Sequence, residues 1–183
     1  MLGGFLDALP RGRDVVVVAH SNAGLYVPAL VRERAAVAAL FVDAGLPPRQ
    51  GPIALAPSGF REFLSTKANM DGLLPGWTHW WSEEELDGLF GSGPSRADVE
   101  REQPRLPVSY FDGSMHADAG WDDLPCGYLG FGDTYVLERL DAQSRGWPVA
   151  TIAGGHLHPL VAPAQVAAAI DALLRELGIR PEG

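Results

Sequence analysis

The feature that most constrains the fold is Val15–Ala19, an apolar, β-branched run without polar alternation. A strand of this composition is apolar on both faces, which is typical of parallel sheets covered by helices on either side. Three later segments have the same character: Val37–Asp43, Gly127–Phe131 and Pro148–Ile152. These four segments predict the strands of a buried parallel sheet.

Helical segments alternate with these strands, as expected for an α/β fold. They are predicted at residues 2–9, 22–34, 134–145 and 164–177. The middle, about 49–120, is instead rich in glycine, proline and aromatic residues, with one helical stretch at 82–90, where Ser82 and Glu85 have the spacing of a capping box. We therefore expect one α/β domain over residues 1–183, with a small, largely irregular or helical cap insertion at about 49–120.

The first candidate for chemistry is Ser21, which follows the strand Val15–Ala19 and precedes a helical segment. A serine on a tight strand-to-helix turn presents its hydroxyl at the carboxyl edge of the sheet, and small residues at Ala19 and Ala23 let strand and helix approach. The same turn directs the backbone amide of Asn22 beside Ser21, as an oxyanion donor. A serine that only caps the helix would have a similar sequence, so both interpretations stay open.

Two later residues complete a catalytic set. His156 follows two glycines directly after the last strand, where an imidazole can reach the sheet edge and act as base for the serine. Asp133 follows the preceding strand and would hold that imidazole in the required tautomer. The chain order of serine, aspartate and histidine is the order found in α/β-hydrolases.

The segments Val15–Gly24, Leu40–Pro47 and Gly154–His156, with Pro163 beyond them, resemble the α/β-hydrolase superfamily, and within it the small esterase and hydroxynitrile-lyase-like branch. The resemblance covers about residues 1–48 and 122–178, and the middle corresponds in position to a variable cap. It implies that Ser21 is the nucleophile, His156 the base and Asp133 the acid. It also implies early strands and a loop that supplies a second oxyanion amide. Their absence predicts an N-terminally truncated fold and a weak enzyme.

Other residues compete for these roles. Asp43 follows the strand after the nucleophile helix and is the alternative acid, although a turn or cap carboxylate would look the same. His158 lies two residues from His156 and is expected to be a hydrogen-bonded neighbour. His20 precedes the serine and is expected to pack against or orient its turn. Both histidines are also expected to line the substrate pocket. The insertion's three tryptophans would also line that pocket or form a small core of their own: Trp77, Trp80 and Trp81.

Composition excludes several classes of function. A net charge of -9 without a basic stripe argues against nucleic-acid or anionic-membrane binding. One cysteine, Cys126, and five histidines without ligand spacing predict neither a metal site nor a cofactor. No targeting segment or membrane span is found, which predicts a cytoplasmic protein. The strand 15–19 would be an unprotected sheet edge, so we expect a homodimer or other oligomer that covers it.

The favoured function is therefore a serine hydrolase that acts on a small ester, lactone or thioester through an acyl-enzyme on Ser21. A first alternative is non-hydrolytic lyase, cyclase or dehydratase chemistry in which His156 carries the proton. A second is a catalytically weak homologue that binds a small molecule in the aromatic cap. The fold alone does not distinguish these functions.

Overall fold

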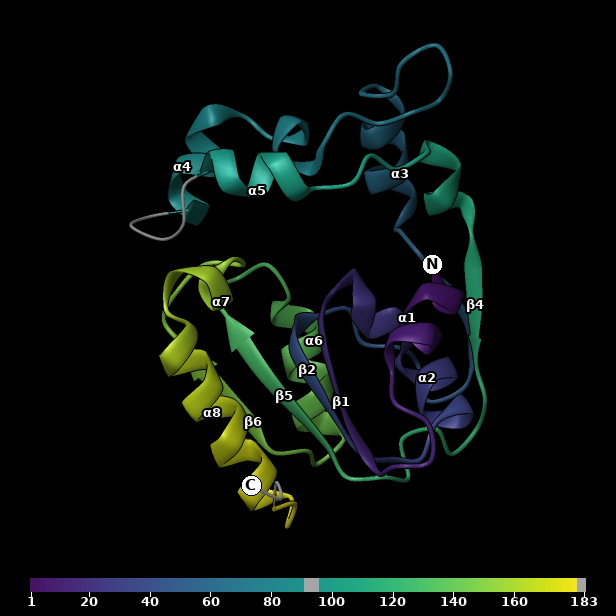
Figure 1. Cartoon of the computed structure of the whole chain (residues 1–183), viewed down its shortest axis with the longest axis vertical. Helices are drawn as coiled ribbons and strands as arrows, with labels where there is room; N and C mark the ends of the chain where they lie inside the picture. The colour runs from purple at the N-terminus through teal and green to yellow at the C-terminus, as the bar shows by residue number, and fades with distance from the viewer. Residues whose placement is uncertain (91–95, 181–183) are drawn as a thin grey trace. The chain divides into compact units, whose positions relative to one another are not determined.

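The computed structural model, which describes residues 1–90 and 96–180, contains a four-stranded parallel sheet with the order β1-β2-β5-β6 (Figure 1). One row of paired residues crosses the sheet through Ala19, Phe41, Tyr128 and Val149. All four predicted strands are present and the predicted α/β class is confirmed: β1 (Val15–Ser21), β2 (Ala36–Ala44), β5 (Cys126–Phe131) and β6 (Val149–Ile152).

Helices cover both faces of this sheet because its strands are apolar on both sides. On one face, Leu129 and Phe131 belong to a buried cluster with Leu173 of α8 (Pro163–Glu176). On the other face, α6 (Val136–Ser144) brings the side chain of Arg139 against Gly130 of β5. The side chains of neighbouring residues on β5 therefore point to opposite helical layers.

The segment after β1 is helical but not uniform. A short 3-10 helix, η1 (Asn22–Tyr26), precedes α2 (Val27–Glu33), which has Pro28 in its first turn. The single helix predicted over residues 22–34 is thus divided at Val27. The first helix of the chain, α1 (Leu2–Ala8), packs beside α2.

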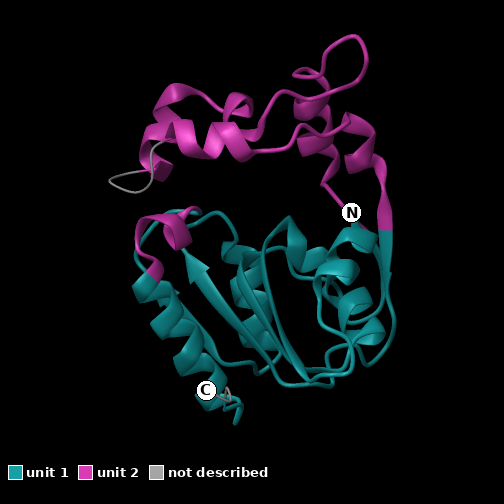
Figure 2. Ribbon diagram, viewed as in Figure 1, with its two compact units in different colours: residues 1–53, 115–156, 164–183 teal, residues 54–114, 157–163 magenta. Residues whose placement is uncertain are grey.

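The chain divides into two compact units (Figure 2). Unit 1 holds the four-stranded sheet and comprises residues 1–53, 115–156 and 164 onward. Unit 2 comprises residues 54–114 and 157–163, so it combines most of the predicted insertion with the short helix α7 (His158–Val161). The assignment of the whole chain to one domain stays a prediction.

Unit 2 is more regular than the sequence suggested. The predicted helix is present as α4 (Glu83–Phe90), and its capping box is formed, because the Ser82 amide donates to the Glu85 carboxylate at 2.8 Å. The expectation of one helical stretch in the middle was nevertheless wrong. Further elements are α3 (Ser58–Ser65), η2 (Trp77–Trp80), α5 (Arg96–Glu102) and η3 (Val108–Asp112). A two-stranded sheet, most of which belongs to unit 1, pairs β3 (Gly51–Ala54) with β4 (Ser114–Ala117).

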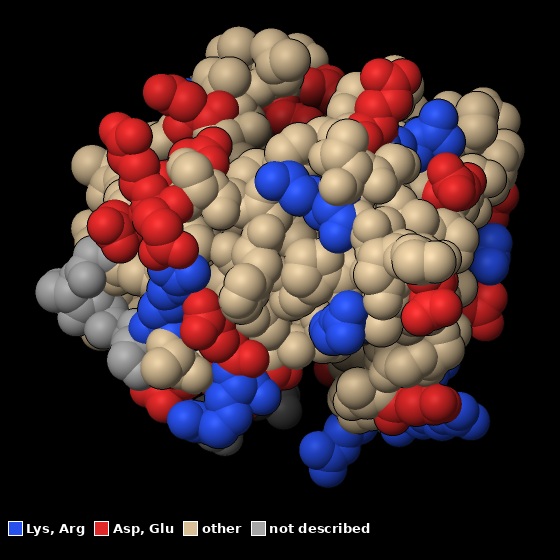
Figure 3. Space-filling view, turned by 90° about the horizontal axis from the view of Figure 1, so that it is seen from above, with Lys and Arg blue, Asp and Glu red and all other residues tan. Residues whose placement is uncertain are grey.

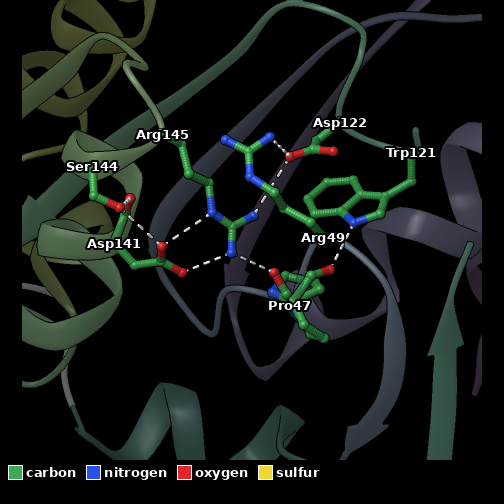
Figure 4. A network of polar contacts seen from close by, with 8 residues as sticks. Pro47, Arg49, Trp121, Asp122, Asp141, Ser144 and Arg145 are labelled. Carbon is green, nitrogen blue, oxygen red and sulfur yellow. Dashed lines mark hydrogen bonds and ion pairs between the residues drawn. The ribbon is translucent and has the colours of Figure 1, made fainter. Parts of the chain in front are cut away.

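A buried polar network anchors the segment that follows β2 (Figure 4). Arg145, at the end of α6, donates to the carbonyl of Pro47 at 2.8 Å and lies 3.7 Å from the Asp122 carboxylate. Both charged side chains are buried. The indole of Trp121 donates to the next carbonyl, that of Pro48, at 2.8 Å. These bonds hold the chain in place soon after it leaves the carboxyl end of β2.

Strand β1 stands at one end of the strand order, as the sequence predicted, and its Val18 is 47% exposed. The oligomer expected to cover this edge stays a prediction. We expect light scattering at micromolar concentration to give the mass of a dimer or larger species, and Val18→Lys to give a monomer, because a lysine on an edge strand opposes pairing. Leu137→Lys, on the exposed side of α6, is the control. A monomeric unmodified chain would refute the prediction.

Acidic and basic side chains are interspersed on the face drawn in Figure 3. The expectation that nucleic acid and anionic membranes are not partners rests on the net charge and stays a prediction. Within the described residues, no helix combines the length and apolar composition that a membrane span needs.

Candidate active site

Ser21 is the last residue of β1 and has an unusual backbone, with φ 59° and ψ -135°. A non-glycine residue in such a conformation costs about 1–3 kcal/mol and is often found at functional sites. Its carbonyl accepts a hydrogen bond from the amide of Gly45, which follows β2, at 3.0 Å. The turn after β1 is therefore tied to the turn after β2. This is the strand-turn-helix geometry that the sequence around Ser21 predicted.

The side chain of Ser21 meets His156 across the carboxyl edge of the sheet, although the two are 135 residues apart in sequence. Ser21 Oγ lies 3.0 Å from His156 Nε2. The alternative in which Ser21 caps the helix is not what the structure shows, because its side chain makes no capping hydrogen bond to η1. The hydroxyl is instead held by the imidazole.

Asp43 occupies the other side of the imidazole, with its Oδ2 2.6 Å from His156 Nδ1. Because a carboxylate only accepts hydrogen bonds, Nδ1 carries the hydrogen and Nε2 is left to accept the serine proton. The other carboxylate oxygen, Oδ1, accepts from the Phe131 amide at 3.0 Å. Asp43 is buried and has a φ of 43°. Its carboxylate is therefore fixed between two strands and the histidine.

The preference for Asp133 over Asp43 as the partner of the histidine was wrong. Asp133 does follow β5, but its side chain is exposed and Asp43 takes the place at Nδ1. The physical reason lies in the backbone. The left-handed turn at Asp43 sends its carboxylate back over the sheet edge toward Phe131 and His156. The turn after β5 instead uses Gly132, with a φ of 50°, and leaves Asp133 in solvent.

His20 packs against His156. Its Nε2 donates to the His156 carbonyl at 3.0 Å, and the two imidazole rings are stacked with centroids 4.5 Å apart. Burial, and then the neighbouring His156, lower the pKa of His20 below its ordinary value. A neutral His20 adds no positive charge beside the base. The sequence predicted that His20 packs against or orients the serine turn and lines the substrate pocket. The structure shows it packed against His156, and its role in the pocket stays a prediction.

Tyr135 is a member of the site that the sequence did not identify. It follows β5 and directly precedes α6. Its ring centroid lies 5.5 Å from that of His156. Burial is the main cause that raises the pKa of Tyr135 above its ordinary value. The only sequence signal was position, since Tyr135 follows a strand that ends at the same sheet edge.

The three tryptophans lie in unit 2, where they belong to an aromatic cluster. Trp80 is buried and its indole donates to the Pro75 carbonyl at 2.9 Å. Trp77 meets Trp81 edge to face. The interpretation as a core of the insertion is therefore confirmed, while their role in a substrate pocket stays a prediction. The same holds for His158, which is buried at the start of α7 in unit 2.

Two further residues complete the comparison with the sequence. Asn22 is the first residue of η1, so its backbone amide stands at the amino end of a helix directly after the serine, where the oxyanion donor was expected.

Cys126 is buried at the start of β5, and burial raises the pKa of its thiol to about 12. A thiol with that pKa is protonated at neutral pH and is a poor nucleophile.

The geometry of unit 1 is therefore that of a hydroxyl, an imidazole and a carboxylate in a hydrogen-bonded row. In such a row the imidazole can take the hydroxyl proton, and the carboxylate stabilises the imidazolium that forms. The strained turn presents the hydroxyl, and the backbone amide of Asn22 follows it directly at the start of η1. This arrangement can form a covalent ester on Ser21 and then hydrolyse that ester with water.

Comparison with known proteins agrees with this geometry. The model of the alpha/beta hydrolase family matches residues 2–169. Among curated protein sequences, none matches the chain.

Several solved structures share the fold at low sequence identity. An extracellular alpha/beta-hydrolase from a Paenibacillus species is 14% identical with a TM-score of 0.66, over 94% of this chain and 77% of that one. Tomato methylketone synthase I in complex with 2-tridecanone is 12% identical, with a TM-score of 0.62, over 96% and 76% of the two chains. An Arabidopsis methylesterase is 14% identical, with a TM-score of 0.59, over 95% and 75%.

Proposed function

Because the chain belongs to the alpha/beta hydrolase family, we propose that it is a serine hydrolase that cleaves a small ester, lactone or thioester through an acyl-enzyme on Ser21. The observation that carries the proposal is the row in which His156 lies 3.0 Å from Ser21 Oγ and 2.6 Å from Asp43 Oδ2. In this proposal Ser21 is the nucleophile, His156 the base and Asp43 the acid. The family membership supports hydrolysis, and the contacts support these three roles.

The first half of the reaction forms the acyl-enzyme. Ser21 Oγ attacks the carbonyl carbon while its proton moves to His156 Nε2, and the carbonyl electrons move to the oxygen. The Asn22 amide donates to that oxyanion. When the carbonyl re-forms, the bond to the leaving group breaks, and the leaving alcohol or thiol takes the proton from Nε2.

The second half releases the acid. A water molecule gives a proton to Nε2 and attacks the acyl carbon, and the new intermediate expels Ser21 Oγ, which recovers its proton from the imidazole. Asp43 keeps the negative charge throughout and stabilises each imidazolium. His20, whose pKa is lowered by burial, stays neutral at the stacked face of the ring and does not oppose this protonation.

A fluorophosphonate probe tests the nucleophile. We expect folded protein to acquire one adduct, located at Ser21 by mass spectrometry of peptides, because only a serine with a neighbouring base reacts quickly. Ser21→Ala should remove the adduct. Ser144→Ala is the matched control, because the Ser144 hydroxyl lies on α6 and bonds to Asp141 instead of to a histidine.

Two results would contradict the proposal. The first is folded protein without an adduct on Ser21. The second is turnover that survives Ser21→Ala but not His156→Ala, which would support lyase, cyclase or dehydratase chemistry on the same scaffold.

A further inference from the structure

We propose that Tyr128 is a positioning residue for the acid of the row, because its hydroxyl holds the backbone that presents Asp43 to His156. The inference rests on the proposed function and deepens it, since it says how the acid is kept in place. Tyr128 lies in β5 and is fully buried, so it acts through Asp43 and not on the substrate.

The strand pairing around Asp43 is irregular. Ser21 of β1 pairs with Ala44 of β2. The residue before Ser21 pairs with Val42, so the register between the two strands skips Asp43. An extra residue of this kind forms a β-bulge, which re-aims a side chain and often lies beside an active site. The bulge coincides with the positive φ that turns the Asp43 carboxylate toward the imidazole, so the row requires that the bulge keeps this conformation.

The Tyr128 hydroxyl makes two hydrogen bonds to the residue that follows Asp43. It donates to the Ala44 carbonyl at 2.8 Å and accepts from the Ala44 amide at 3.1 Å. Regular pairing of β2 with β5 extends from Ala39 to Val42, so Ala44 lies beyond the last of these pairs. One side chain thus takes the place of a strand partner for both backbone groups of Ala44.

These two bonds are costly to lose, because Ala44 is fully buried. A buried amide or carbonyl without a partner is strongly disfavoured, so the backbone would rotate to find another one. Such a rotation would change the dihedral angles of Asp43, the residue directly before Ala44. Burial also raises the pKa of Tyr128, so the phenol keeps the proton that it donates.

Strand β5 therefore holds the acid at two points. The Phe131 amide donates to Asp43 Oδ1 at 3.0 Å, and Tyr128, earlier on the same strand, holds the backbone after Asp43. The other carboxylate oxygen lies 2.6 Å from His156 Nδ1. Without the phenol the first hold would remain and the second would be lost, so we expect the carboxylate to shift at the imidazole while the fold is kept.

Tyr128→Phe tests the role, because it removes one oxygen and keeps the ring. With p-nitrophenyl acetate as substrate, we expect kcat to fall about 10–10²-fold, as for a catalytic group misplaced by about 1 Å. KM should change less than about twofold, because the buried phenol binds no part of the substrate. Tyr26→Phe is the matched control, since Tyr26 is another buried tyrosine of unit 1, whose ring packs on Phe5. Its kcat should equal that of the unmodified chain, and thermal unfolding should show both variants folded.

A double-mutant cycle separates a positioning role from a general loss of structure. If Tyr128 acts through Asp43, Tyr128→Phe should change kcat less than about threefold in protein that already carries Asp43→Asn. Replacing Tyr128 with 4-aminophenylalanine keeps the ring and a donor to the Ala44 carbonyl, so its kcat should lie between those of Tyr128→Phe and the unmodified chain. The same cycle with this replacement decides the question if Tyr128→Phe does not fold.

Unchanged kcat in Tyr128→Phe would overturn the inference while fluorophosphonate labelling of Ser21 still supports the hydrolase. Losses that multiply in the cycle would also overturn it, because the phenol would then act independently of Asp43. An unmodified chain that neither labels at Ser21 nor cleaves the ester would overturn both proposals.

Discussion

Replacing Asp43 with asparagine is expected to lower kcat for p-nitrophenyl acetate by about 10⁴-fold, the effect seen when the acid of such a row becomes an amide. The carboxylate accepts from His156 Nδ1 at 2.6 Å and from the Phe131 amide at 3.0 Å. An amide at this position favours the wrong imidazole tautomer and removes the charge that stabilises the imidazolium. Steady-state kinetics at neutral pH measure the loss.

Asp133→Asn is the matched control for this experiment, because Asp133 is an exposed aspartate after the neighbouring strand. Its kcat should stay within about twofold of the unmodified chain, as expected for a surface change away from the reacting groups. Thermal unfolding should show both variants folded. The assignment of Asp43 is refuted if Asp133→Asn loses activity and Asp43→Asn retains it.

Gly24→Ala is expected to destabilise the fold by about 3 kcal/mol, at the upper end of the usual cost of overpacking. A Cβ at position 24 would lie 2.1 Å from the carbonyl oxygen of Gly45 and 3.1 Å from the Cβ of Ala44. The oxygen belongs to backbone that is tied to Ser21 through the Gly45 amide, so neither turn can retreat without moving the other. Chemical denaturation measures the loss as a lower midpoint.

Gly88→Ala provides the comparison, since Gly88 lies in α4 and an added Cβ meets nothing within 4 Å. It should leave stability unchanged or raise it by up to about 1 kcal/mol, because alanine favours helix. If Gly24→Ala were as stable as the unmodified chain, the close packing of η1 on the segment after β2 would be wrong.

The sheet was predictable because its signal is local. Val15–Ala19 and the three other runs are apolar enough to indicate strands that are buried on both faces. Because helical segments alternate with these strands, a parallel arrangement follows. The interior of unit 2 was harder to predict. α3 carries Phe60, Phe63 and Leu64 on helical spacing, a signal that was present but short, while α5 is held by ion pairs such as that of Arg96 with Glu100.

For the candidate site, the sequence was sufficient to predict one contact of the histidine but not the other. The meeting of Ser21 and His156 followed from where two strands end, because the carboxyl ends of parallel strands share one edge. The choice between Asp43 and Asp133 did not follow from strand ends, since both residues come after neighbouring strands. The choice depends on which turn has a positive φ at the aspartate itself, and the neighbouring residues in the sequence do not reveal this φ. The position of Tyr135 depends on the course of the turn after β5, where Gly132 has a φ of 50°, and the sequence did not reveal that course either.

The three residues of the hydrogen-bonded row differ in how far apart they lie along the chain. Ser21 and Asp43 lie at the ends of two adjacent, consecutive strands, whereas His156 arrives 113 residues after Asp43, from the loop beyond β6. β6 is short and stands at the far end of the strand order. Local unfolding of that edge would move His156 away while Ser21 and Asp43 stay in place. A low concentration of denaturant should therefore abolish turnover reversibly before the rest of the sheet unfolds.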